Sequence, residues 1–127
     1  MRVGIIGLQS VYWPRAFADN AKRIAGVELC AAATAGRSAE AVKHSLGLSP
    51  QEFAEQYGVR LYDDPVEMVK AEGIEAAFVA AEHSRMVELV EAVAPLGVHL
   101  YIAKPMANTI EKAKRIVEAC AKAGIGC

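Results

Sequence analysis

The sequence predicts an α/β fold built on a doubly wound parallel sheet, and three observations lead to this class. Apolar strand-like runs alternate with helix-like segments along the whole chain. The apolar runs contain few polar residues, as strands do when helices cover both faces of a parallel sheet. The length of 127 residues suits one domain and is sufficient to bury a core. Because parallel crossovers are right-handed, few other topologies remain.

The first half of the chain supplies three strand signals and three helix signals. Each helix signal is bounded by residues that favour helix ends, such as Pro near the first turn or Gly after the last. Ser49, Pro50 and Glu52 form a complete capping-box signature. The predicted strands are residues 2–6, 27–33 and 59–62, and the predicted helices are residues 15–25, 38–46 and 49–58.

The second half continues the alternation. Asp64 and Pro65 open a helix that extends to about Ala71, and Asn108 or Thr109 caps the last helix. The final residues, Ile-Gly-Cys, resemble the start of a sixth strand. We therefore expect one domain over residues 1–127 that belongs to a longer protein. The remaining predicted elements are strands at residues 75–81 and 98–103 and helices at residues 84–96 and 110–123.

Composition excludes several functional classes. Hydrophobic residues make up 54% and charged residues 23% of the chain, which is typical of a globular protein. The net charge of −1, without clustered basic residues, gives no sign of nucleic-acid binding. No run is long enough to cross a membrane. The three cysteines fit no zinc or redox spacing, so we expect no metal site, buried thiols and a cytoplasmic location.

The turn after the first strand is a candidate phosphate-binding site. A dinucleotide fingerprint requires G-x-G-x-x-G between a strand and a helix, where free N–H groups and the helix dipole favour an anion. Gly7 provides the tight turn, but Gln9 and Tyr12 occupy the second and third glycine positions. We expect Gln9 and Ser10 to donate hydrogen bonds to phosphate, and Tyr12 to delay or displace the helix. The alternative is a plain turn without a ligand. The candidate turn comprises Gly7, Leu8, Gln9, Ser10, Val11 and Tyr12.

The end of the second strand bears on the choice of cofactor. NAD-binding domains place an acidic residue here, which bonds the adenine ribose. This sequence has Thr34 instead, followed by Arg37 and Ser38, with no acid before Glu40. An Arg at this place can pair with a ribose 2′-phosphate, which favours NADP over NAD. The alternative is that Arg37 is a solvated residue in the first turn of a helix.

At this point the chain resembles a known family. The segments VGIIGL, VELCAAATAGRS, FAEQYGVRLYDDPVEMV and IEAAFVAAEHSRMVELVEAVAPLGVHLYIAKPMANTIEKAKRIVEA occur in the order and spacing of the N-terminal Rossmann domain of the Gfo/Idh/MocA oxidoreductases. The family implies NAD(P)-dependent hydride transfer on a sugar, polyol or related small molecule. It also implies a second α/β domain that carries further catalytic residues. Homo-oligomers are common in the family, and a homo-oligomer is compatible with this sequence.

The most specific part of the resemblance is Lys104-Pro105. The family's lysine lies near the nicotinamide and the substrate hydroxyl, where an ammonium group stabilises a developing alkoxide and relays a proton. The resemblance therefore implies a catalytic role for Lys104. Pro105 after it is a candidate cis-proline.

The chain also departs from the family pattern at this edge. Ala103 and Met86 stand where the family has Glu and His. From the expected topology we suggest that Glu82 replaces the missing partner of Lys104. The rival interpretation of all the departures is a non-catalytic scaffold or a nucleotide-sensing module. The loop Ala80, Ala81 and Glu82, together with Lys104 and Pro105, completes the expected cofactor-binding set.

Overall fold

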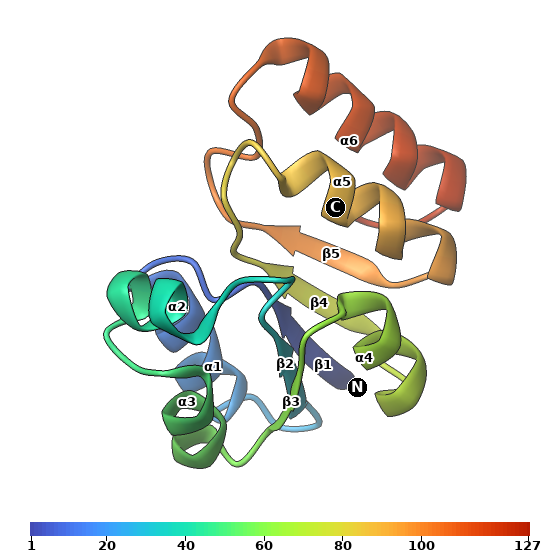
Figure 1. The fold of residues 1–127 in the computed structure, drawn as a ribbon. Helices are drawn as coiled ribbons and strands as arrows, with labels where there is room; N and C mark the ends of the chain where they lie inside the picture. The colour runs from blue at the N-terminus through green and yellow to red at the C-terminus, as the bar shows by residue number, and fades with distance from the viewer.

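The computed structural model describes residues 1–127 and contains one five-stranded sheet between two layers of helices (Figure 1). The strand order is β3-β2-β1-β4-β5 and every pairing is parallel. The order reverses direction at β1, so the predicted doubly wound, Rossmann-type fold is confirmed. The strands are β1 (Arg2–Ile6), β2 (Glu28–Ala33), β3 (Arg60–Tyr62), β4 (Ala76–Val79) and β5 (His99–Ile102).

Helices cover the sheet in two groups of three (Figure 1). The first three pack on one face around Phe53 and Leu46, and the last three pack on the other face around Met68 and Met86. Each face thus has its own apolar core, as the continuous apolar strands require. The helices are α1 (Trp13–Ala21), α2 (Ala39–Leu46), α3 (Pro50–Tyr57), α4 (Pro65–Glu72), α5 (Met86–Val93), followed by the 3-10 turn η1 (Ala94–Leu96), and α6 (Ile110–Ala123).

Local sequence explains where most helices begin. The capping box of α3 forms as predicted, because the Glu52 N–H donates to Ser49 Oγ at 3.1 Å and the Ser49 N–H donates to Glu52 Oε2 at 2.6 Å. Asp64 caps α4 through the Val66 N–H. Of the two candidates for α6, Thr109 is the residue whose side chain accepts the capping bond.

The boundaries of α1 differ from the prediction of residues 15–25. The helix begins at Trp13, with Tyr12 at the N-cap position and Pro14 in the first turn, and no side chain caps it. The Trp13 N–H donates to Ser10 Oγ at 3.1 Å, which ties the preceding turn to the start of the helix. The helix ends at Ala21, and turns follow up to Gly26. Tyr12 neither delays nor displaces the helix, because its side chain points outward and is 63% exposed.

Two further expectations about the second half need correction. β4 ends at Val79 and α5 begins at Met86, so residues 80–85 form a loop where the sequence predicted a longer strand and an earlier helix. The last residues form no strand, although the Leu100 N–H donates to the Gly126 carbonyl at 2.9 Å. This contact runs beside β5 in the way a sixth strand would begin.

Candidate functional site

The carboxyl ends of all five strands lie along one edge of the sheet, and the strand order sets the sequence of residues along it. From β3 to β5 the first residues beyond the strands are Asp63, Thr34, Gly7, Ala80 and Ala103, with Lys104 next to Ala103. Ligands of doubly wound sheets bind at this edge, where the strand order reverses. β2 and β5 are three strands apart, about 14 Å at the usual spacing.

Gly7 lies in a position that only glycine fits without strain. Its φ is +77°, and a Cβ built on it would lie 2.7 Å from the Ala80 carbonyl oxygen and 3.0 Å from the Ala81 Cβ. The Gly7 N–H donates to the Ala33 carbonyl at 2.8 Å. The turn therefore stays close to the ends of β2 and β4: Gly7 and Leu8 are buried, and the backbone becomes accessible from Gln9 and Ser10 onward.

The N–H groups that follow Gly7 form the strongest ligand signal in the structure. Those of Ser10, Val11 and Tyr12 donate to no acceptor within the protein and precede α1 directly. Ser10 has φ of +145°, a conformation that favours glycine and is typical of strained functional turns. Its Oγ accepts from Trp13, which leaves its hydroxyl hydrogen free. Free consecutive N–H groups at a helix N-terminus form an anion-binding concavity.

Gln9 stands at the position of the fingerprint's second glycine and faces partly inward. Its N–H donates to the Ala80 carbonyl at 3.0 Å, and its Oε1 is buried without a hydrogen-bond partner. Leu8, just before it, is fully buried. Ala80 and Ala81 are also buried, and they contact this turn mainly through the backbone. The turn offers free N–H groups to an anion, whereas the side chain of Gln9 takes up space that glycine would leave free.

The end of β2 carries a carboxylate that the sequence analysis missed, because it comes from another strand. Thr34 is buried, and its hydroxyl donates to Asp63 Oδ1 from the end of β3. The Gly36 N–H donates to the same oxygen at 3.2 Å. β2 and β3 pair in parallel up to Ala33 and Tyr62, so Thr34 and Asp63 are the next residues of the two strands. That register is the signal that would have found Asp63.

The side chain of Arg37 is largely buried, so the alternative of a solvated residue is wrong. Its side chain is 10% exposed. Nη1 donates to the Leu8 carbonyl at 3.3 Å and to Ser45 Oγ at 2.8 Å, and Nη2 donates to the Ala41 carbonyl at 3.2 Å. Arg37 thus ties the candidate phosphate turn to α2. Ser38 caps α2 by accepting from the Ala41 N–H, which makes its role structural.

The loop after β4 brings two charged residues to the edge. Glu82 Oε1 lies 3.8 Å from Arg37 Nε and within salt-bridge distance of no other base, so the suggested pairing with Lys104 is wrong. Arg85 reaches back across the edge, and its Nη2 donates to the Ala35 carbonyl at 2.8 Å. The sequence analysis missed Arg85 because the predicted helix from Ser84 placed it on a helix surface.

Lys104 lies beyond β5 and is exposed, with no carboxylate within salt-bridge distance. The peptide bond to Pro105 is cis, as the sequence suggested. The two departures from the family pattern nearby are core positions, because Ala103 is 6% and Met86 0% exposed. Neither position can therefore carry a charged side chain to the edge without repacking.

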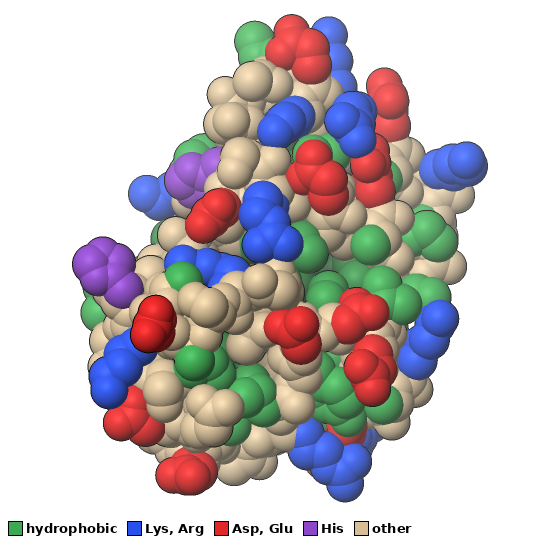
Figure 2. All heavy atoms as spheres, viewed as in Figure 1, with side chains coloured by type: hydrophobic (Ala, Val, Ile, Leu, Met, Phe, Trp, Pro, Cys, Tyr) green, Lys and Arg blue, Asp and Glu red, His purple; other side chains and the backbone are tan.

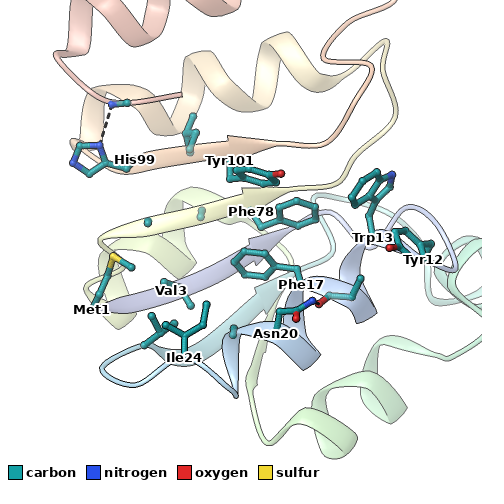
Figure 3. Close-up of a pocket in the computed structure, with 17 residues that line it drawn as sticks. Met1, Val3, Tyr12, Trp13, Phe17, Asn20, Ile24, Phe78, His99 and Tyr101 are labelled. Carbon is teal, nitrogen blue, oxygen red and sulfur yellow. Dashed lines mark hydrogen bonds between the residues drawn. The ribbon is translucent and has the colours of Figure 1, made fainter.

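An apolar hollow of about 560 Å³ lies on the sheet face beside α1 (Figure 3), and extends from Met1 and His99 at the amino end of the strands to Tyr12 and Trp13 beside the candidate turn. Of its 17 lining residues, 14 are hydrophobic. The rings of Phe17, Phe78 and Tyr101 stack across α1, β4 and β5, with centroids 4.6 and 5.5 Å apart. Tyr101 is 66% exposed. We name this surface, lined by Tyr12, Trp13, Phe17, Ile24, Phe78 and Tyr101, the α1–β5 face.

Other classes of site find no support in the structure. No group of three His, Cys, Asp or Glu side chains is placed to hold a metal ion. None of the helices combines the length and the apolar character needed to span a bilayer. Acidic and basic side chains are interspersed on the face shown in Figure 2, without a large region of one sign.

Comparisons with known proteins agree with this geometry. The model of an oxidoreductase family with an NAD-binding Rossmann fold, GFO_IDH_MocA, matches residues 1–126. A search of curated proteins gave no match.

Solved structures share the fold over nearly the whole chain. A Thermotoga maritima protein described as a probable dehydrogenase is 27% identical, with a TM-score of 0.80 over 98% of this chain and 34% of its own. The WlbA dehydrogenase from Bordetella pertussis, in complex with NADH and UDP-GlcNAcA, is 23% identical, with a TM-score of 0.80, and the match covers 98% of this chain and 35% of that chain. An Agrobacterium radiobacter oxidoreductase, in complex with NAD+, L-tartaric acid and magnesium, is 21% identical, with a TM-score of 0.79, and the match covers 98% of this chain and 33% of that chain. The chain thus spans about a third of the length of these structures.

Proposed function

The chain belongs to the Gfo/Idh/MocA oxidoreductase family, and we propose that it is the NAD(P)-binding domain of an enzyme that transfers hydride to or from a sugar, polyol or related small molecule. The observation that carries the proposal is the turn after β1, where three consecutive N–H groups are free above the cradle at Gly7. Such a turn suits a pyrophosphate. Sugar nucleotides are bound by relatives such as the Bordetella pertussis enzyme, in complex with UDP-GlcNAcA.

The order of residues along the edge supports one direction for the cofactor. The N–H groups of Ser10, Val11 and Tyr12 would hold the pyrophosphate at β1. The adenosine would then lie toward Thr34 at β2, and the nicotinamide toward Lys104 beyond β5. When bound, the cofactor supplies or accepts the hydride.

Lys104 is the residue that we propose for proton transfer. It is exposed at the nicotinamide end of the edge and has no carboxylate partner, so its ammonium group is free to approach a substrate hydroxyl. There it would stabilise the developing alkoxide and pass a proton. Glu82 is engaged with Arg37, so the orientation of Lys104 depends on other groups.

We also propose that this domain is part of a longer, two-domain enzyme whose remaining chain covers the α1–β5 face. The solved relatives are about three times as long, and exposed apolar surfaces of this kind mark contacts with other protein. Gly126 lines the hollow on this face, so a continuing chain would start beside it. In a Cys127→Ser background, a cysteine introduced by Tyr101→Cys should react with a maleimide in the 127-residue chain and be protected in the full enzyme. Equal reactivity in both would contradict this assignment.

Binding to the purified chain tests the proposed function directly. NADH and NADPH should raise its melting temperature in proportion to the logarithm of ligand concentration over Kd, and adenosine, which lacks phosphates, should have much less effect. In the full enzyme, Lys104→Met should lower kcat and leave the Kd of the cofactor unchanged. If neither dinucleotide binds at millimolar concentration to the chain or to the full enzyme, the scaffold interpretation is correct.

A further inference from the structure

We propose that Arg85, in the loop after β4, is the residue that recognises a 2′-phosphate on the adenine ribose and selects NADP(H) over NAD(H). This inference rests on the proposed function. The sequence pattern placed cofactor selection at Arg37, in the loop after β2. The inference assigns it instead to Arg85, which is 50 positions from Ala35 in that loop. Three features of the edge lead to the assignment.

The first feature is that Arg37 has little capacity for another anion. Three of its hydrogen bonds go to the Leu8 carbonyl, Ser45 Oγ and the Ala41 carbonyl, and its Nε faces Glu82 at 3.8 Å. Turning the guanidinium toward a ribose would leave these partly buried oxygens without their charged donor, which is costly. A 2′-phosphate would therefore have to compete with the fold for Arg37.

The second feature is that Arg85 is free to bind. Arg85 is an exposed residue with no carboxylate within salt-bridge distance, and its one hydrogen bond goes from Nη2 to the Ala35 carbonyl. Most of its five N–H groups, including the Nε and Nη1 donors, remain available for an anion. A guanidinium pairs with phosphate through two parallel hydrogen bonds.

The third feature is the turn that Arg85 contacts. Ala35 and Gly36 both have positive φ, +55° and +75°, and Ala35 is a residue that rarely adopts this conformation. Arg85 Nη2 lies 3.7 Å from the place where a Cβ of Gly36 would be. Because Gly36 has no side chain, a phosphate on the ribose can approach this turn, and the guanidinium borders the open space.

Asp63 is the opposing charge at the same turn, and it determines how selective the site can be. Its Oδ1 already accepts from the Thr34 hydroxyl and the Gly36 N–H, so it is held against the β2–β3 side of the turn. It would repel a 2′-phosphate and favour a 2′-hydroxyl. Removing this carboxylate should therefore strengthen the preference that Arg85 creates.

The test is a calorimetric or fluorescence titration of NADPH and NADH, and of 2′,5′-ADP against 5′-AMP. We compare the unmodified chain with Arg85→Gln and with Arg23→Gln, which removes an exposed guanidinium that has no side-chain partner and lies after α1. Arg85→Gln should weaken NADPH and 2′,5′-ADP by about tenfold to a hundredfold, as expected for a charged hydrogen-bonded pair. It should change the Kd of NADH and of 5′-AMP by less than about threefold. Asp63→Asn should lower the Kd of NADPH, and Arg23→Gln should change the Kd of neither dinucleotide.

The outcomes separate this inference from the proposed function. If both dinucleotides bind and Arg85→Gln leaves the NADPH to NADH ratio unchanged, the assignment to Arg85 is wrong and the proposed function stands. If a folded Arg37→Gln variant, and not Arg85→Gln, changes the ratio, selection belongs to Arg37. If no dinucleotide binds to the unmodified chain or to the full enzyme, both are overturned.

Discussion

Replacing Gly7 with alanine should destabilise the protein more than any comparable change at a turn glycine. A non-glycine residue in the left-handed region costs about 1–2 kcal/mol. The new methyl group would also lie 2.7 Å from the Ala80 carbonyl oxygen. That oxygen belongs to the backbone just beyond β4 and also accepts from the Gln9 N–H, so it cannot move without disturbing the turn. Overpacking of this kind adds about 1–3 kcal/mol, and we expect a total loss of about 3 kcal/mol.

Gly58→Ala provides the matched control for this prediction. Gly58 has a similar φ of +67°, but nothing lies within 4 Å of its Cβ position. Gly58→Ala should therefore lower the free energy of unfolding only by the cost of the left-handed conformation, about 1–2 kcal/mol. Urea unfolding followed by circular dichroism gives both free energies, provided that the m-values agree. Equal losses for the two variants would show that the turn after β1 can relax, and would refute the close approach on which the phosphate cradle depends.

Three further predictions concern Arg37, Cys120 and Glu72. Arg37→Met should cost about 2–4 kcal/mol in urea unfolding because buried oxygens lose a charged donor; a loss below about 0.5 kcal/mol would place Arg37 on a solvated surface. Burial, reinforced by a hydrogen bond with Cys127, raises the pKa of the Cys120 thiol to about 12, so at pH 8 a thiol reagent should label Cys127 in the native chain and Cys120 only after unfolding. The hydrogen bond from Tyr62, with support from two arginines, lowers the pKa of Glu72 below its ordinary value of 4.5. The stabilisation by ionised Glu72 is thus present above pH 4.5 and is lost as the pH falls through the lowered pKa. Glu72→Gln should therefore weaken the fall in the free energy of unfolding at acid pH. An unchanged fall would contradict the assignment.

The sequence was sufficient for the fold because local and global signals agree. Ser49 with Glu52, Asp64 before Pro65, and Thr109 each mark a helix start that the structure reproduces. Apolar runs without alternation require cover on both faces, which only a two-layered parallel arrangement provides. Errors occurred at boundaries without a capping side chain, as at α1, which begins two residues before the predicted start with Tyr12 at its N-cap.

The candidate site was predictable only where it depends on a single turn. The turn at Gly7 was predicted as a candidate from spacing alone, and the free N–H groups of Ser10, Val11 and Tyr12 lie at the edge that the fold class predicts for a ligand. Asp63 and Arg85 reach the end of β2 from other segments of the chain, so their contribution depends on register and loop path. The predicted pairing of Glu82 with Lys104 was wrong for the same reason. The topology predicts that both lie at the carboxyl edge, but not that Glu82 faces Arg37 there.

Arg37 links three of the loops at the edge, and under the proposed function this link separates the proposed phosphate binding from the proposed cofactor selection. It begins in the loop after β2, bonds the Leu8 carbonyl in the turn after β1, and faces Glu82 in the loop after β4. Its guanidinium therefore holds the shape of the turn after β1. The side chain of Arg85 has one hydrogen bond, to the Ala35 carbonyl, and none to that turn, so its replacement should remove a charge without loosening the turn after β1. A change at Arg37 should consequently weaken every dinucleotide together, whereas a change at Arg85 should alter only their ratio.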